Sequence, residues 1–157
     1  MKIPLEKIKK NSFNSNEMSG EEYERFRESI VKFSMKDPIK VRPKDSFFEI
    51  IDGEHRFKVA KELGWQKIGA KVEDCTEDEA KVRNSRYNNR GHLNPVKEFK
   101  KWFEHTKSGW THEKISREYG IDRSHVTKGI DIYLNDILRE NVRMRTITVR
   151  EKEGGLE

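Results

Sequence analysis

The sequence predicts an α+β fold in which a small mixed domain, residues 1–90, precedes an all-α domain, residues 91–150. Strand-like and helix-like segments alternate up to about residue 90, and strand signals nearly vanish beyond it. The composition agrees with this division. A chain of 157 residues with 32% hydrophobic and 39% charged side chains suits one domain or two small ones with small cores. Residues 151–157 are predicted to be a tail or a cloning scar.

The mixed domain begins with a predicted strand at Lys2–Ile8, followed by a polar loop. Ser19 is expected to cap the first helix, because its side-chain oxygen can accept a hydrogen bond from a first-turn N–H. Two strands, Ile39–Arg42 and Phe47–Ile51, are predicted on either side of a turn at residues 43–46. The first helix carries one predicted buried stripe at helical spacing, formed by Tyr23, Phe26, Ile30 and Phe33.

The next helix, predicted over Glu54–Leu63, starts directly after Asp52-Gly53. A glycine between a strand and a helix leaves backbone N–H groups free to face an anion, which the helix dipole also favours. Glu54, His55 and Arg56 add a carboxylate, an imidazole and a phosphate-binding fork in the same turn. This spacing predicts a nucleotide or phosphate pocket, with an ordinary strand-to-helix turn as the alternative.

The last strand of this domain is predicted at Lys67–Val72, and Thr76 is expected to cap a helix that runs to about Asn89. Between them lies the single cysteine, Cys75, among acidic neighbours that disfavour a thiolate. A lone cysteine forms no internal disulfide and suits a reducing compartment. The sequence shows no signal peptide and no run of about 18 apolar residues, so we expect a cytoplasmic protein with no membrane partner.

The second domain is predicted to begin with a helix that Asn94 caps and Pro95 starts. Its apolar stripe is interpreted as core, with a functional aromatic platform as the alternative, and consists of Val96, Phe99, Trp102 and Phe103. The formal net charge of +5 and the pI near 9.2 favour an anionic partner. The basic excess is spread over both domains, so binding would depend on local placement of charges.

A helix-turn-helix pattern occupies residues 110–130. Thr111 can cap the first helix, Gly120 ends it and Asp122 can cap the second, whose interior Gly129 weakens it by about 1 kcal/mol relative to alanine. In such a motif the second helix enters the major groove of double-stranded DNA. An ordinary αα-hairpin is the alternative. The residues expected to face DNA are Thr111, Arg123, Ser124, His125, Thr127 and Lys128.

Three ordered motifs carry a resemblance to a known family. Asp52–Arg56, which reads Asp-Gly-Glu-His-Arg, resembles the signature loop of the ParB/sulfiredoxin superfamily. Ser34–Pro43 resembles the first nucleotide box of ParB partition proteins, and Asn88–Pro95 resembles the third. The helix-turn-helix follows in the same order as in those proteins. The resemblance therefore covers nearly the whole chain and implies a ParB/sulfiredoxin-like fold for residues 1–90.

The resemblance also implies a function. In ParB proteins the signature loop cradles the triphosphate of CTP, so CTP is the expected nucleotide and a CTPase-type switch the expected device. The implied role is plasmid or chromosome partition or transcription regulation by a nucleoid-associated protein, with double-stranded DNA, a homodimer and a partition ATPase as partners. The candidate nucleotide-binding residues are Arg42, Asp52, Gly53, Glu54, His55, Arg56, Asn88, Asn89 and Arg90.

The chain departs from the ParB pattern at three points. The acidic residue that holds Mg²⁺ in ParB proteins falls at Arg86, and its asparagine partner falls at Tyr87. Mg²⁺ prefers carboxylate oxygens, and neither of these two positions carries a carboxylate. Mg²⁺ is therefore a candidate cofactor to which no ligand residue is assigned. One arginine of the ParB loop is replaced by His55, whose charge depends on pH. Sulfiredoxins have a catalytic cysteine where this chain has Glu54, which argues against sulfiredoxin chemistry.

An enzyme on the same scaffold is the alternative function. Some archaeal members of the superfamily resemble this chain around Asp-Gly-x-His-Arg and act as phosphotransferases on free serine, and nuclease activity has been attached to other members. Glu17 or Glu54 would then be the catalytic base that activates a hydroxyl for attack on phosphate. The helix-turn-helix, which the small-molecule kinases lack, favours the DNA-binding interpretation.

Overall fold

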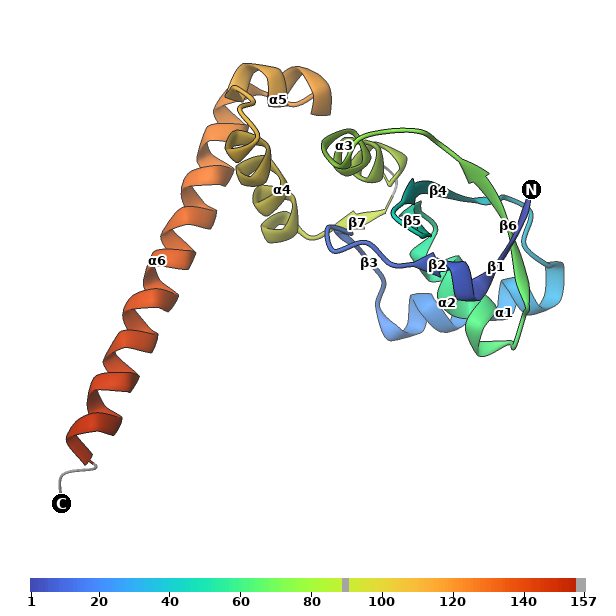
Figure 1. Cartoon of the computed structure of the whole chain (residues 1–157), viewed down its shortest axis with the longest axis horizontal. Helices are drawn as coiled ribbons and strands as arrows, with labels where there is room; N and C mark the ends of the chain where they lie inside the picture. The colour runs from blue at the N-terminus through green and yellow to red at the C-terminus, as the bar shows by residue number, and fades with distance from the viewer. Residues whose placement is uncertain (89–90, 155–157) are drawn as a thin grey trace. The chain divides into compact units, whose positions relative to one another are not determined.

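The computed structural model describes residues 1–88 and 91–154, with side chains of the C-terminal helix described as far as Arg145. The chain forms two compact units, Met1–Glu98 and Phe99–Glu157 (Figure 1). The first unit contains the strands, and the described elements of the second are helices.

A five-stranded mixed sheet organises the first unit, with the strand order β1-β6-β4-β5-β2. The central strand β4 pairs antiparallel with β5 and parallel with β6. A separate ribbon pairs β3 (Asn16–Glu17) with β7 (His92–Leu93). The strands of the main sheet are β1 (Lys2–Pro4), β2 (Ile8–Lys9), β4 (Ile39–Lys44), β5 (Phe47–Asp52) and β6 (Lys67–Val72).

Helices cover both faces of this sheet. Successive side chains of β5 point to opposite faces. Ile50 belongs to a core that includes Phe57 of α2, whereas Ile51 belongs to a smaller core that includes Ala80 of α3. Helices α2 and α3 therefore lie on opposite faces. The helices of this unit are α1 (Gly20–Phe33), α2 (Glu54–Glu62) and α3 (Glu77–Tyr87).

The predicted single strand at Lys2–Ile8 is wrong. β1 and β2 are separate strands, joined by the short 3₁₀ helix η1 (Leu5–Lys7). β1 pairs with β6 and β2 pairs with β5, at opposite edges of the sheet. One straight strand cannot reach both edges, so the chain has to turn between them.

Local signals locate α1, α2, α3 and the strands β4, β5 and β6, whereas β3 and β7 were not predicted, and β7 lies in the segment predicted to be all-α. Ser19 accepts a hydrogen bond from the Glu22 N–H, and Thr76 forms a capping box with Glu79, as expected. Strand β4 continues through Pro43, beyond its predicted end, since β6 no longer pairs with β4 there and a missing N–H is tolerated. The predicted stripe on α1 is only partly buried. Ile30 is 6% exposed and Phe33 60% exposed.

The second unit contains the C-terminal part of α4 (Pro95–Lys107), together with α5 (His112–Tyr119) and α6 (Arg123–Gly154). Its buried core consists of Trp102, Ile115, Val126 and Ile130. The first turn of α4 belongs to the first unit, because the Glu98 carboxylate accepts hydrogen bonds from the hydroxyls of Ser15 and Ser85. Among the described residues, no helix has the length and apolar character needed to cross a membrane.

Candidate functional site

The loop between β5 and α2 has the geometry of an anion-binding turn. Gly53, the N-cap of α2, has φ 106° and ψ 27°, a left-handed conformation that favours glycine. A Cβ at this position would stand 2.6 Å from Cγ2 of Ile39. Gly53 offers no side-chain cap to the first turn of α2. The loop thus packs closely against β4. Because Gly53 has no side chain to cap the helix, the first-turn N–H groups of α2 are open to a ligand.

Two cavities meet at this loop. The larger, of about 560 Å³, lies between the end of α1, the start of β4 and Arg56. The smaller, of about 120 Å³, lies at the N-terminus of α2. Phe26, Asp52 and Arg56 line both cavities, so the two are adjacent compartments of one site. The smaller one is also lined by Asn14, Asn16, Met18, Gly53, Glu54, His55 and Asn88.

Arg56 supplies a permanent positive charge to the site. Its Nη1 donates to the backbone carbonyls of Asp37 and Pro38, both at 2.9 Å. Its Nη2 donates to Asp52 Oδ2 at 3.1 Å. Arginine cannot lose its charge at physiological pH. The site therefore holds a fixed guanidinium, which the protein directs toward one carboxylate and two neutral carbonyls.

Glu54 is held in place by residues from distant parts of the unit. Asn14 Nδ2 donates to Glu54 Oε2 at 2.6 Å, and Lys10 Nζ lies 3.5 Å from Oε1. Asn84 on α3 donates to Asn14 Oδ1 at 3.2 Å and to the carbonyl of Ile51 at 2.8 Å. These contacts join the N-terminal segment, the loop and α3 around the smaller cavity.

His55 lines the smaller cavity and has one unsatisfied ring nitrogen. Its Nε2 is buried and has no hydrogen-bond partner among the described residues. Burial lowers the pKa of His55 below its usual value, against the neighbouring Glu54 carboxylate, which raises it. The imidazole is therefore neutral near pH 7. A buried ring nitrogen without a partner is costly.

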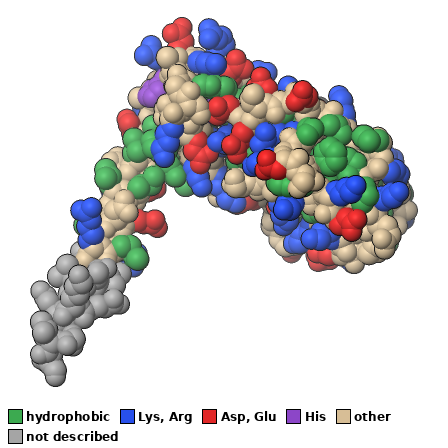
Figure 2. Space-filling view, viewed as in Figure 1, with side chains coloured by type: hydrophobic (Ala, Val, Ile, Leu, Met, Phe, Trp, Pro, Cys, Tyr) green, Lys and Arg blue, Asp and Glu red, His purple; other side chains and the backbone are tan. Residues whose placement is uncertain are grey.

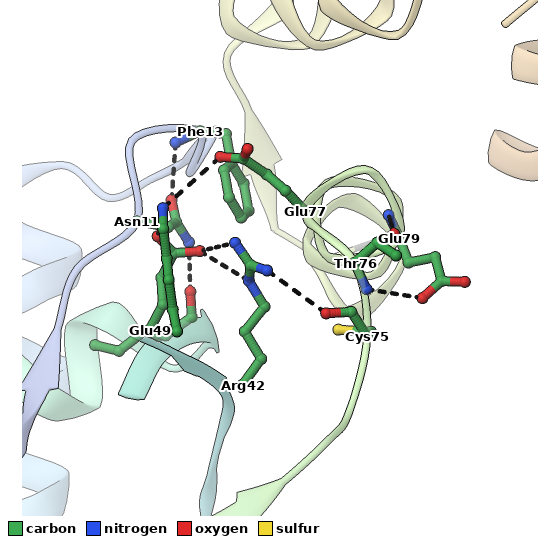
Figure 3. A network of polar contacts seen from close by, with 10 residues as sticks. Asn11, Phe13, Arg42, Glu49, Cys75, Thr76, Glu77 and Glu79 are labelled. Carbon is green, nitrogen blue, oxygen red and sulfur yellow. Dashed lines mark hydrogen bonds and ion pairs between the residues drawn. The ribbon is translucent and has the colours of Figure 1, made fainter. Parts of the chain in front are cut away.

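Arg42 does not reach either cavity. Val41 belongs to the core on the α2 face, so the side chain of Arg42 points to the opposite face. There its Nη2 lies 2.9 Å from Glu49 Oε1, and its Nη1 donates to the Cys75 carbonyl at 3.5 Å (Figure 3). Arg42 is 7% exposed and Glu49 4% exposed. Arg42 thus ties β4 to Glu49 of β5 and to the segment before α3.

The first 89 residues show to which protein family the chain belongs. The sequence profile of the ParB N-terminal domain matches residues 1–89. The chain belongs to this family. Among curated proteins, the chromosome-partitioning protein Spo0J of Thermus thermophilus is 30% identical over 135 residues, which cover 83% of this chain and 49% of that protein. The ParB-family chain thus spans about half the length of this relative.

Solved structures support the fold. ParB of Caulobacter crescentus complexed to the centromeric parS site matches with a TM-score of 0.56 and 23% identity, over 82% of this chain and 69% of that chain. The same protein complexed with CTP-gamma-S matches with a TM-score of 0.51 and 24% identity, over 82% and 75%. At this identity the likeness shows the fold alone. The prediction of a mixed ParB-like domain of helices and strands is confirmed.

The cavity includes residues that sequence reasoning did not assign to the site. Asn14, Asn16 and Lys40 are lining residues that we did not predict. The signal for the first two is the asparagine-rich loop before α1, which the sequence indicated only as polar. Asn88 lines the smaller cavity, as predicted. Asn89 and Arg90 lie outside the described residues.

Glu17, a candidate base, lies on β3 and is engaged by two residues near the start of α4. Lys97 Nζ lies 3.0 Å from its Oε1, and Asn94 Nδ2 donates to the same oxygen at 3.0 Å. The Lys97 contact is the main cause of a pKa below the usual value for this carboxylate. Glu17 does not line either cavity.

In the helical unit of this ParB-family chain, α5 and α6 meet at a tight turn. Gly120 has φ 67°, and the Ser116 hydroxyl donates to the Ile121 carbonyl at 2.5 Å. Asp122 Oδ1 accepts from the Ser124 N–H at 3.1 Å and so caps α6. The Thr111 hydroxyl accepts from the Lys114 N–H and caps α5.

The residues predicted to face DNA differ in their surroundings. Arg123, Ser124 and Lys128 are exposed. The His125 ring is also exposed but lies edge-on to Trp102, with centroids 5.5 Å apart. Thr127 is half-buried and faces α5, where its hydroxyl lies 2.9 Å from His112 Nδ1. The structure thus leaves the side chains of Arg123, Ser124 and Lys128 exposed near the start of α6.

Proposed function

We propose that this chain is a ParB-like DNA-binding protein whose N-terminal domain binds a nucleotide, CTP first among candidates. The observation that carries the proposal is the pair of adjacent cavities at the N-terminus of α2, which Gly53, His55 and Arg56 help to line. A Caulobacter crescentus ParB of the same fold was solved with CTP-gamma-S, which supports CTP as the nucleotide.

The two cavities suit the two parts of a nucleotide. The smaller cavity borders the first turn of α2, whose N–H groups and dipole favour phosphate oxygens. The larger, of about 560 Å³, has room for a nucleoside and includes the aromatic rings of Phe26 and Phe33. The exposed ring of Phe33 lines this cavity, where it would contact the nucleotide base.

The described residues do not fit a protein-held Mg²⁺ ion. They contain no group of three or more histidine, cysteine, aspartate or glutamate side chains placed to hold a metal. Of the carboxylates at the smaller cavity, Asp52 is paired with Arg56, and Glu54 with Lys10 and Asn14. Tyr87, at the position of the ParB asparagine, directs its hydroxyl to Glu73. We therefore expect nucleotide binding that does not depend on Mg²⁺.

We further propose that α5 and α6 form a separate helix-turn-helix domain over residues 91–150, in which the start of α6 enters the major groove. Arg123, Ser124 and Lys128 would contact the DNA first, with His125 and Thr127 beside them and Thr111 near the backbone. Figure 2 shows lysine and arginine interspersed with aspartate and glutamate over the visible face. Binding would therefore depend on these individual residues.

A free-serine-type phosphotransferase receives less support. A general base should be free to accept a proton. Glu17 is paired with Lys97 and has a lowered pKa, and Glu54 is already an acceptor for Asn14. The homodimer, the partition ATPase partner and the nucleoid-associated location stay predictions.

Calorimetric titration with CTP, ATP, ADP and GTP, with and without Mg²⁺, tests the nucleotide. We expect selective binding of CTP at micromolar concentration that does not require Mg²⁺. Preference for ADP or ATP would favour the phosphotransferase. Absence of binding by all four would leave a DNA-binding protein on a scaffold without this ligand.

A further inference from the structure

The segment between α1 and β4, residues Ser34–Pro38, is named the strap (Figure 1). It lies between two cavities and lines both. All five strap residues line the larger nucleotide cavity. They also line a second cavity of about 240 Å³, whose other lining residues are Lys2, Trp65 and Gly69. A change in the position of the strap would therefore alter both cavities.

Arg56 ties the strap to the phosphate-binding loop. Two of its three hydrogen bonds go to backbone carbonyls of the strap, those of Asp37 and Pro38. The third goes to Asp52, which precedes Gly53. The guanidinium side chain is 18% exposed and lines both compartments of the nucleotide site. One side chain thus connects the strap to the place where an anion would bind.

The bonds to the strap are of a kind that an anion can displace. The carbonyls of Asp37 and Pro38 are neutral acceptors, whereas a phosphate oxygen is charged. The bonds from Arg56 to the carbonyls already have an ionised donor and are stronger than neutral ones. A phosphate oxygen adds the attraction between opposite charges, and arginine is suited to bidentate contact with phosphate. A phosphate in the smaller cavity would therefore compete directly for the Arg56 guanidinium.

The strap also begins in a conformation that favours release. Ser34 has φ 63° and ψ 180°, a backbone region populated almost only by glycine. The surrounding contacts have to hold such a residue in place. Ile39, directly after the strap, is fully buried and anchors its other end. Movement would thus be confined to the strap itself.

We propose that Arg56 is a positioning residue that exchanges partners: without a ligand it holds the strap, and a bound phosphate draws it away and releases the strap. The inference rests on the proposed function for the identity of the anion. It adds that phosphate occupancy is communicated to the second cavity, on the other side of the strap.

Met35 offers a reporter for this exchange. It is half-buried in the strap and packs against the main core, so release of the strap would expose it. The double variant Met35→Cys with Cys75→Ser carries one cysteine, whose rate of alkylation by iodoacetamide reports strap opening. Pyrophosphate is the probe, because it carries no nucleoside that could cover residue 35.

The expected results separate coupling from a structural role. In the reporter protein, pyrophosphate should increase the alkylation rate. Adding Arg56→Lys, which keeps the charge but loses the fork, should raise the ligand-free rate about 10-fold, the effect of losing one to two hydrogen bonds. It should also remove most of the response to pyrophosphate. The matched control is Arg27→Lys, since Arg27 pairs with Glu62 rather than with the strap. It should leave both rates unchanged.

Thermal melting first establishes that the variants are folded. Three further outcomes would contradict the inference. Calorimetric binding of pyrophosphate or CTP without a change in alkylation would overturn the inference and leave the proposed function standing. Absence of binding by both would overturn the two together. An Arg56→Lys variant that still responds to pyrophosphate like the unsubstituted reporter would show that another group moves the strap.

Discussion

Gly129 on α6 lies directly against the ring of Phe99 on α4. A Cβ at position 129 would stand 2.5 Å from Phe99 Cδ1 and 2.7 Å from Trp102 Cζ3. By helix propensity alone, alanine is better than glycine by about 1 kcal/mol. The close approach reverses this preference, because neither aromatic ring can yield without disturbing the core of the helical unit. Gly129 therefore permits the contact between α4 and α6.

We predict that Gly129→Ala lowers the free energy of unfolding of the helical unit by about 1–3 kcal/mol, the usual cost of overpacking. Urea denaturation followed by circular dichroism measures this. Gly20→Ala is the matched control. It lies in the first turn of α1, where a Cβ meets nothing within 4 Å, so stability should be unchanged or slightly higher. A stabilising effect of both substitutions would contradict the packing argument.

The buried pair of Glu49 and Arg42 gives a second stability prediction. Glu49→Ala would leave the Arg42 guanidinium buried without its carboxylate, which costs about 3–5 kcal/mol. Glu77→Ala is the control. Glu49 and Glu77 both contact Lys44, but the Glu77 side chain is 50% exposed. Its effect should stay within about 0.5 kcal/mol. Equal losses for the two variants in urea denaturation would show that burial of the pair is not the cause.

Local features of this fold were predicted from the sequence, whereas features that depend on the whole sheet were not. The caps at Ser19 and Thr76 and the turn at Gly53 depend on neighbours within a few positions, so local patterns predicted them. Arg42 was assigned to the nucleotide site without support from the cavity geometry. Its direction depends on which face of β4 is covered by α2, and this is a property of the whole sheet.

Arg56 and Gly129 illustrate the same limit. The sequence predicted a phosphate-binding fork at Arg56, but its bonds to two strap carbonyls connect segments that are distant in the chain. For Gly129 the sequence indicated only a weak point in a helix. The rings that require a glycine there lie on another helix, so no local pattern could identify them.

The pH dependence of stability should include a contribution from His55. Burial lowers the pKa of His55 below the usual 6.5, so the unfolded state binds a proton more readily than the folded state. The stabilising contribution of the neutral ring is fully present above pH 6.5. It is lost progressively as the pH falls from 6.5 toward the folded pKa. We therefore predict that His55→Gln loses less stability than the unsubstituted protein between pH 8 and pH 5, measured by urea denaturation. Parallel curves would show that His55 is not the titrating group.

Nucleotide binding should depend on Arg56. We predict that Arg56→Ala raises the Kd for CTP at least about 10-fold, because a hydrogen bond to a charged group contributes about 1.5–3 kcal/mol. The fold should be retained, since the guanidinium lies outside the hydrophobic cores. Calorimetry measures the affinity and thermal melting checks the fold. Arg27→Ala, which removes a cation near α2 but outside both cavities, should bind CTP normally. Unchanged affinity in Arg56→Ala would remove the phosphate-loop assignment.

DNA recognition should depend on Arg123, the first residue of α6 and exposed at its surface. We predict that Arg123→Ala weakens binding to a duplex selected by this protein from random DNA by about 1–3 kcal/mol, with a smaller effect on a scrambled duplex. Fluorescence anisotropy at fixed salt measures both affinities. Arg139→Ala is the matched control, because Arg139 is exposed on the same helix but more than four turns beyond Arg123. Its binding should change little. Specific binding that survives deletion of residues 110–134 would place the DNA contact outside α5 and the start of α6.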